Sequence, residues 1–393
     1  SFTKGDIKKV NVAMNSGMYK NAFTCGIPNS NEVGNVFAAA LGVVAGNADK
    51  GLESLADVTP EDNVKAQKMI DQGKITVELS GITSRIFIEA TVETEEDKAI
   101  VTIRDSHTNI TKIIVNDKVE LETEDEKKTE EDGGEEESHS IHKYTLQQLY
   151  DYVTTVDIEE IRFINEAYKV NLELFHEGLE NPRTTFARQL LAINKGKEVS
   201  DDEQKTASLM CNAAIEARVI GLDKPAMSIT GSGAHGIIAT MPLYAAYKVN
   251  GYTEEQLLRA TALSYLVCMY IKEYSGRLSA FCGCAIAAGS GMACALVYLR
   301  GGTVEMMAHT LNNMASSITG MICDGGKVGC SLKVSTGTLS ALLCAKTALN
   351  NAPLKDSDGI VANTPEKCIQ NMAYLSKHGM KDVDMTIVEI MEK

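Results

Sequence analysis

Four cysteines beside glycine residues are the side chains in this sequence best suited to chemistry. Cys282 and Cys284 form a Cys-Gly-Cys, and Cys323 and Cys330 stand on the two sides of a glycine-rich loop. Cysteine thiolates are the usual ligands of iron–sulfur clusters and also bind zinc. Glycine allows the backbone to approach a bound group closely. The pattern predicts a metal or iron–sulfur site.

The spacing of the first pair limits how many thiolates reach one group. Side chains two positions apart near the start of a helix point away from each other. We therefore expect Cys284 to be a ligand together with Cys323 and Cys330, with Cys282 in reserve. Two other interpretations fit the same residues: a structural zinc bound by all four, or four small buried hydrophobic side chains. The cysteines in apolar helical stretches are predicted to be core residues: Cys211, Cys268, Cys294, Cys344 and Cys368.

A second candidate is the glycine-rich segment at residues 230–240, which reads TGSGAHGIIAT. Its small residues precede a predicted helix, and the free backbone N–H groups at a helix N-terminus suit a carboxylate or a phosphate. The Lys-Ser or Lys-Thr of a nucleotide-binding loop does not follow. His235 in this turn either contacts a substrate or packs in the core. Lys272 and Arg277, just before the first cysteine pair, either supply positive charge or form ion pairs on a helix surface.

The elements that must position these residues divide the chain into two parts. The first part alternates apolar and polar residues, as half-buried strands do, and two helical segments lie between its first two strands. This mixture predicts an α+β domain with a layer of helices on an antiparallel or mixed sheet. The predicted strands are residues 8–15, 74–81, 85–94, 98–105 and 109–117, and the predicted helices are residues 32–46 and 59–73.

From residue 145 onward, apolar residues recur at helical spacing and glycine-rich breaks separate the segments. We therefore predict an α+β domain over residues 1–143, followed by an all-α domain over residues 144–393 that carries the cysteines. The acidic run at residues 120–138 has no apolar periodicity. It is expected to be exposed beside the domain boundary, as a hairpin tip or a linker.

Composition limits the partners and the location. The net charge of −15 argues against nucleic acid, because phosphate contacts need a basic face. The clustered cysteines do not resemble a disulfide framework and no secretory leader opens the sequence, so we expect a cytoplasmic protein. Residues 281–299 are uncharged and long enough for a membrane span, but their Ala, Gly, Ser and Cys content favours a buried core helix. We therefore expect no membrane partner, and a homodimer is the default oligomer.

Several segments resemble one enzyme family. SGRLSAFCGCAIAAGSGMACALVYLRGG, GMICDGGKVGCSLKVSTG and ITGSGAHGIIATMP resemble the α-chain domain of the iron–sulfur L-serine dehydratases, and more closely the single-chain L-cysteine desulfidases. The first half is similar to that family in SGMYKNAFTCGIPNS, DVTPED and DSHTNI, so the resemblance covers almost the whole chain. It favours the iron–sulfur cluster over zinc.

The resemblance implies β-elimination from an amino acid that gives pyruvate and ammonia. A [4Fe–4S] cluster held by three cysteines would bind the substrate's thiol or hydroxyl at its open iron. L-Cysteine is the preferred substrate and L-serine the nearest alternative; a non-catalytic sensor of an amino acid or of redox state is the alternative from another class. By position the resemblance assigns Cys284, Cys323 and Cys330 as ligands. The positions matching substrate contacts are Ser106, His107, Thr108, Asn109, Lys20, Asn21, Ser232, Gly233 and His235, with Lys272 and Arg277 as added positive charge.

The catalytic base is left open. Family members usually begin with a further segment whose Gly-Cys-Thr-Glu-Pro motif carries the cysteine taken to be the base, and this sequence has no such motif. Cys25 lies in a different context, FTCGIP, so the role is not transferred to it. Either the N-terminus is truncated, or a neighbouring Cys, His or Lys takes the proton, or the protein does not catalyse the reaction.

Overall fold

A mixed sheet forms the first half of the chain in the computed structural model, which describes residues 2–81, 85–123, 140–276, 278–356 and 358–393. The strand order is β2-β1-β3-β4-β5-β6. β1 pairs with β2 in parallel, and the other neighbouring strands are antiparallel, as the predicted mixed sheet requires. The strands are β1 (Ile7–Asn15), β2 (Ile75–Gly81), β3 (Phe87–Thr94), β4 (Lys98–Arg104), β5 (Ile110–Val115) and β6 (Lys118–Glu122).

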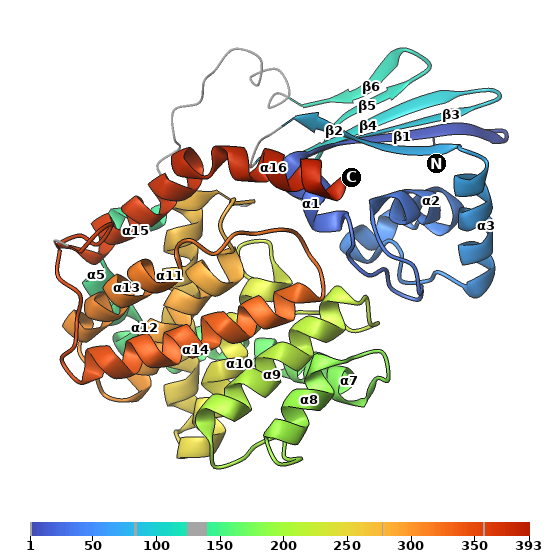
Figure 1. Cartoon of the computed structure of the whole chain (residues 1–393). Coiled ribbons are helices and arrows are strands. Elements are labelled where there is room, and N and C mark those ends of the chain that lie inside the picture. The colour runs from blue at the N-terminus through green and yellow to red at the C-terminus, as the bar shows by residue number, and fades with distance from the viewer. Residues whose placement is uncertain (1, 82–84, 124–139, 277, 357) are drawn as a thin grey trace.

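One face of this sheet is covered by helices (Figure 1). Val10, Val12 and Met14 of β1 are buried toward the helices, whereas Lys9 and Asn11 alternate with them on the other face. This alternation is the two-residue period of a strand with one buried face. The covering elements are α1 (Ser16–Ala22), α2 (Asn35–Ala45), the short helix η1 (Ala48–Glu53) and α3 (Pro60–Asp71). The first half is therefore the predicted α+β layer structure.

The second half is helical, as predicted, and holds the larger hydrophobic core. Its first elements are η2 (Ser140–Lys143), α5 (Leu146–Thr155), α6 (Ile158–Ile161), η3 (Arg162–Ile164), α7 (Asn165–Glu180), α8 (Phe186–Ile193) and α9 (Glu203–Val219). The next are α10 (Gly233–Asn250), α11 (Glu254–Ser275), η4 (Cys284–Ala288), α12 (Gly289–Leu299), α13 (Val304–Ile318) and α14 (Gly329–Leu349). The last are α15 (Pro365–Tyr374), η5 (Leu375–Gly379) and α16 (Lys381–Met391).

The uncharged run at residues 281–299 lies at the centre of this core. It forms the π-helix η4 and then α12, both buried. Gly291 brings α12 close to α11, since a Cβ there would lie 2.2 Å from the carbonyl oxygen of Ser264. A Cβ on Gly337 of α14 would lie 2.8 Å from Ala285. The small residues thus allow close packing of helices, and within the described ranges no helix has both the length and the apolarity to cross a membrane.

The last helix returns to the first half of the chain. α16 lies beside α1 near the sheet (Figure 1). Its Val388 is buried in the same hydrophobic cluster as Val10 and Leu41. Lys20 of α1 and Asp384 of α16 form an ion pair of 2.6 Å in which both residues are buried. α16 therefore joins the two halves, and the domain boundary at residue 143 stays a prediction.

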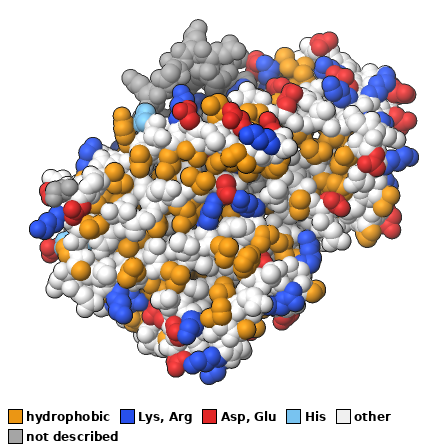
Figure 2. Space-filling view, in the orientation of Figure 1, with side chains coloured by type: hydrophobic (Ala, Val, Ile, Leu, Met, Phe, Trp, Pro, Cys, Tyr) orange, Lys and Arg blue, Asp and Glu red, His pale blue; other side chains and the backbone are white. Residues whose placement is uncertain are grey.

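Two surface features bear on the expectations above. Residues 120–122 of the acidic run are exposed, as expected, but they belong to the strand β6; residues 124–138 lie outside the described residues. Figure 2 shows hydrophobic side chains over the face on which α14 lies. Leu332, Leu339 and Leu343 of α14 are 50, 40 and 62% exposed. Exposed apolar side chains along one helix are typical of contact surfaces, and the homodimer stays a prediction.

Candidate active site

The two cysteine pairs lie side by side, although about forty residues separate them in the sequence. An isolated antiparallel bridge links their segments. The N–H of Cys282 donates to the carbonyl oxygen of Met321 (2.8 Å), and the N–H of Cys323 donates to that of Ala280 (2.8 Å). These backbone hydrogen bonds fix Cys323 against the start of η4, where Cys284 lies.

Cys330 joins the group from the first turn of α14. Its thiol donates to the carbonyl oxygen of Gly325 (3.0 Å). Gly325 has φ +104°, and a Cβ there would lie 2.3 Å from the carbonyl oxygen of Lys20, so this position requires glycine. The loop between Cys323 and Cys330 therefore lies directly on α1.

The four thiols act on one another electrostatically. A hydrogen bond from Cys284 lowers the pKa of Cys282 to about 7. The same bond, then burial and the charges of the other three thiols, raises the pKa of Cys284 well above its ordinary value. Burial, and then Cys323 and Cys282, raises the pKa of Cys330 to about 11. Burial also raises the pKa of Cys323, and Lys20 opposes that shift.

The hydrogen bond between Cys282 and Cys284 corrects one expectation. We expected the two side chains to point apart, as they would in an α-helix. Instead Cys282 precedes the helix and Cys284 is the first residue of a π-helix, whose wider turn changes the direction of its side chains. Both thiols therefore face the loop of Cys323 and Cys330.

The donor set consists of four thiols, which are the ligand type of iron–sulfur clusters. Within the described ranges, no three His, Cys, Asp or Glu side chains surround the position of a single metal ion. The thiolates of a cluster bind different irons and so surround a larger group. Positive charge to balance thiolates is close by, because Lys20 and Lys272 are buried and act electrostatically on these cysteines.

Lys272 is the most isolated of these cations. It lies at the end of α11, is only 3% exposed and donates to the hydroxyl of Ser279 (3.0 Å). The alternative of a surface ion pair is therefore wrong for this residue. Burial lowers its pKa, and the thiols of Cys268, Cys323, Cys284 and Cys282 oppose that shift. In the part of the chain that the structure describes, no carboxylate forms an ion pair with it.

His235 lies against the same group. Its Nε2 is 2.6 Å, and the Nζ of Lys272 is 3.3 Å, from the point where a Cβ on Gly283 would stand. Gly283 separates Cys282 from Cys284, so the imidazole faces the cysteine segment. His235 is buried, and this burial, together with Lys272 and Arg218, holds its pKa well below the ordinary value. It is therefore a neutral imidazole at pH 7.

The other predicted residues of the glycine-rich turn lie at the N-terminus of α10. Ser232 precedes the helix, and its side chain makes no capping hydrogen bond. A Cβ on Gly233 would lie 2.8 Å from Nε of Arg218. Arg218, in the last turn of α9, was not predicted from the sequence. Basic residues are common at helix C-termini because they interact favourably with the helix dipole, so its type and position did not indicate a site.

The DSHTNI segment reaches this turn from the first half of the chain. Cε1 of His107 lies 4.0 Å from the point where a Cβ on Gly231 would stand. Ser106 and Asn109 form the turn between β4 and β5: the backbone N–H of Asn109 donates to Ser106 (3.4 Å) and its side chain donates to the carbonyl oxygen of Arg104 (3.1 Å). Thr108 is exposed in this turn. The structure thus brings His107 to the glycine-rich turn, and its neighbours build the loop that carries it.

Lys20 and Asn21 lie on α1 beside the cysteine loop. Asp384 neutralises Lys20, and the Asn21 side chain donates to the carbonyl oxygen of Gly17 (2.7 Å). The carbonyl oxygen of Asn21 accepts the N–H of Gly326 (3.2 Å). These two residues therefore support the loop. Asp384 was missed, because nothing in its local sequence indicates a partner on the first helix. Arg277 lies outside the described residues.

All ten cysteines are free thiols. The five that we predicted to be core residues are buried, and burial raises the pKa of Cys211, Cys268 and Cys294 to about 12. Cys25 is different, since its sulfur lies 3.8 Å from the point where a Cβ on Gly326 would stand. Cys25 therefore touches the cysteine loop from outside.

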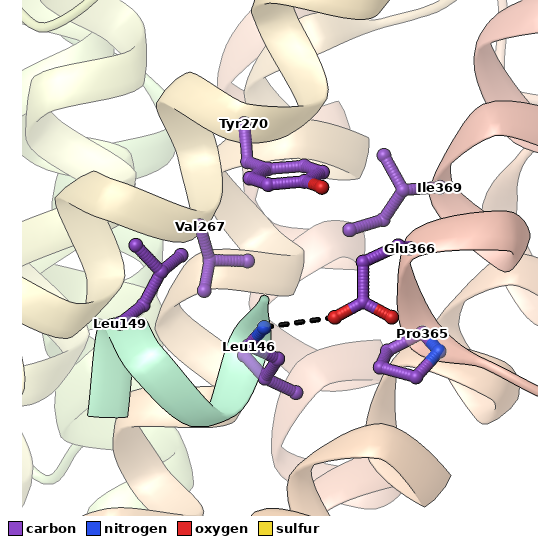
Figure 3. Close-up of a pocket in the computed structure, with 7 residues that line it drawn as sticks. All are labelled: Leu146, Leu149, Val267, Tyr270, Pro365, Glu366 and Ile369. Carbon is purple, nitrogen blue, oxygen red and sulfur yellow. Dashed lines mark hydrogen bonds between the residues drawn. The ribbon is translucent and has the colours of Figure 1, made fainter. Parts of the chain in front are cut away.

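Figure 3 shows a pocket between α5, α11 and α15, and none of the four cysteines of the site lines it. Glu366 in this pocket accepts the N–H of Leu146 (2.8 Å) and so caps α5. The volume of about 10 Å³ holds one water molecule at most. It is too small for an amino acid.

Comparisons with known proteins agree over nearly the whole chain. Residues 49–389 match the family described as serine dehydratase alpha chain. A UPF0597 protein of Clostridium botulinum strain Hall is 40% identical over 395 residues, covering 98% of this chain and 90% of its own. UPF0597 proteins of Caldanaerobacter subterraneus subsp. tengcongensis and Bacteroides fragilis are 36% and 34% identical, each covering 98% of this chain and 89% of its own.

Proposed function

Because the chain belongs to the serine dehydratase alpha chain family, we propose that it is a lyase that converts L-cysteine to pyruvate, ammonia and hydrogen sulfide. L-Serine, which would lose water, is the alternative substrate. The observation that carries the proposal is the meeting of Cys282, Cys284, Cys323 and Cys330 beside the buried ammonium of Lys272. A cytoplasmic location, a homodimer and the absence of a nucleic-acid partner remain predictions.

A [4Fe–4S] cluster is part of the proposal. Cys284, Cys323 and Cys330 would hold it, with Cys282 beside them as the alternative ligand. When bound, a cluster with one open iron supplies a Lewis acid for the departing sulfur or oxygen. The buried ammonium of Lys272, near these thiolates, would offset part of their negative charge.

The other residues divide the work of binding the amino acid. Lys272 has a buried ammonium without an ion-pair partner among the described residues. The substrate carboxylate would therefore be its counter-ion. The N-terminus of α10 with Ser232 and Gly233, backed by Arg218, offers further N–H donors. Lys20 does not share this task, because Asp384 already neutralises it. Its role is to hold α1 against the cysteine loop.

Parallel assays test the proposal. Protein reconstituted anaerobically with iron and sulfide is incubated with L-cysteine or L-serine, and pyruvate is measured along with sulfide or ammonia. We expect turnover of L-cysteine to exceed that of L-serine; the reverse order would change the substrate. Tight binding of either amino acid without turnover would refute the lyase and favour the sensor.

Cysteine variants test the site separately. We expect Cys323→Ala and Cys330→Ala to lose bound iron and the visible absorption of a cluster. Cys368→Ala, a buried core thiol in α15, is the matched control and should retain both. Equal iron content in Cys323→Ala and Cys368→Ala would refute the assignment of the ligands.

A further inference from the structure

Thr230 has an unusual backbone conformation at the edge of the site. Thr230 and Gly231 have φ +54° and +77°. Ile229 and Ser232, on their two sides, exchange backbone hydrogen bonds of 3.3 and 3.1 Å. Tight turns with two positive φ angles favour Asn-Gly or Gly-Gly, and a β-branched residue is an outlier there. Such strain persists where the rest of the structure imposes it, often at functional sites.

The Thr230 hydroxyl lies at Nδ1 of His235, the ring nitrogen other than the one near Gly283, and also contacts the thiol of Cys268. It donates to the carbonyl oxygen of Ile229 (2.7 Å) and lies 2.7 Å from Nδ1 of His235. A hydroxyl has one proton to donate. Because the Thr230 hydroxyl donates it to the carbonyl oxygen of Ile229, its oxygen must accept a hydrogen bond from Nδ1 of His235. This contact places the proton of the neutral ring on Nδ1.

The opposite nitrogen of the ring is then without a proton. Nε2 lies 2.6 Å from the point where a Cβ on Gly283 would stand, and Nζ of Lys272 lies 3.3 Å from the same point. Gly283 is the residue between Cys282 and Cys284 in the sequence. A bare Nε2 cannot donate a hydrogen bond to a substrate carboxylate. It is suited to accept a proton.

We infer that His235 Nε2 is the group that accepts the α-proton of the amino acid, and that Thr230 is the positioning residue that fixes this tautomer. The inference rests on the proposed function. In this step the Cα–H bond breaks and an Nε2–H bond forms, and the electron pair becomes the Cα=Cβ bond. The Cβ–S bond breaks and hydrosulfide leaves with its electron pair.

Four variants test the role of Thr230. Thr230→Ser keeps the hydroxyl, Thr230→Val keeps the shape without it, and Thr230→Gly removes both the hydroxyl and the strain. Lys195→Gly is the matched control, because Lys195 and Gly196 form a second pair with positive φ, at +60° and +71°, on an exposed loop. Each variant is assayed for turnover and for thermal midpoint. The histidine tautomers are read by NMR of protein labelled with ¹⁵N and ¹³C histidine, with His235→Gln assigning the signal.

The expected results separate positioning from folding. In the wild type, Nδ1 of His235 should be protonated and Nε2 bare. Thr230→Val and Thr230→Gly should lower kcat about 10²-fold, the usual contribution of a placed base, and change the tautomer signal. Thr230→Ser should restore both. Thr230→Gly and Lys195→Gly should each have a thermal midpoint no lower than wild type, and only Lys195→Gly should keep full activity.

Three results would overturn the inference. One is an Nε2–H tautomer in the wild type, and another is a Thr230→Val variant within threefold of wild-type kcat. The third is a Thr230→Gly variant whose thermal midpoint falls together with its activity, as a structural role would require. Failure of the proposed function gives a different result, in which the wild type turns over neither amino acid. His235 would then have no proton to accept from a substrate, and the NMR measurement would still decide which tautomer it adopts.

Discussion

Replacement of Asp384 by asparagine should destabilise the protein strongly, because it leaves the ammonium of Lys20 buried without a counter-charge. The two side chains are 2.6 Å apart and are 1% and 10% exposed. At an effective dielectric constant of about 20, two charges at this distance attract with roughly 6 kcal/mol. Removal of one partner of a buried pair usually costs about 3–5 kcal/mol. We therefore expect Asp384→Asn to lose about 3–4 kcal/mol of unfolding free energy, at the lower end because the carboxylate retains some contact with solvent.

A second ion pair provides the control. Lys50 and Asp57 are 2.5 Å apart, but their side chains are 38% and 62% exposed. Exposed pairs contribute about 0–1 kcal/mol, so Asp57→Asn should have a small effect although the distance is nearly the same. The comparison separates burial from distance.

Urea unfolding of the iron-free protein, followed by circular dichroism, measures these differences. The double variant Lys20→Met/Asp384→Leu should recover most of the loss, since an apolar pair leaves no buried charge. The reasoning fails if Asp384→Asn costs no more than Asp57→Asn. It also fails if the double variant is as unstable as Asp384→Asn.

Three further predictions concern the site. Gly283→Ala places a Cβ 2.6 Å from Nε2 of His235 and should lower kcat/KM about 10²-fold. The control Gly289→Ala, whose added Cβ would have its nearest neighbour at 3.5 Å, should keep a kcat/KM near that of the wild type. Equal values of kcat/KM in the two variants would contradict this prediction. Because burial lowers the pKa of His235, its neutral form stabilises the fold above the unfolded value of 6.5 and this contribution is lost as the pH falls toward the folded value. In urea unfolding the wild type should therefore lose stability relative to His235→Gln between about pH 8 and pH 5, and a constant difference would refute the pKa direction. Cys284→Ser should lose iron while Cys282→Ser retains it, and the opposite result of an iron assay would exchange their roles.

Local patterns were sufficient for much of the fold. The alternation around Val10 and Val12 predicted β1, and Thr59 and Pro60 predicted the start of α3, where Thr59 and Asp62 form a reciprocal cap. These signals depend on neighbours within a few residues, so the sequence contains them directly. The exposure of residues 120–122 in the acidic run was also predicted from local sequence. Their strand conformation was not, because it depends on pairing with β5.

The site was predictable in its residue types and less so in its geometry. The glycine-flanked cysteines indicated a shared site, but the contact between Cys282 and Cys284 depends on a π-helix that has no local sequence signal. For Lys272 the sequence left two alternatives, a supply of positive charge or an ion pair on a helix surface, and its burial follows from packing of α11 against η4 and α10. The tautomer of His235 depends on a turn conformation that Thr230 disfavours. The burial of Lys272 depends on segments that are distant in the sequence, whereas the other two features depend on local backbone conformations that the residue types do not specify.

The ion pair between α1 and α16 has a consequence for the order of events during protein synthesis. Its partners are 364 residues apart in the chain. At about 5–20 residues per second, Lys20 is added to the chain roughly 20–70 s before Asp384. Through this interval Lys20 lacks the carboxylate that pairs with it in the folded protein. The buried ion pair that joins α1 to α16 can therefore form only when nearly the whole chain has been synthesised, and any folding of the first half before that point must leave Lys20 without its counter-charge.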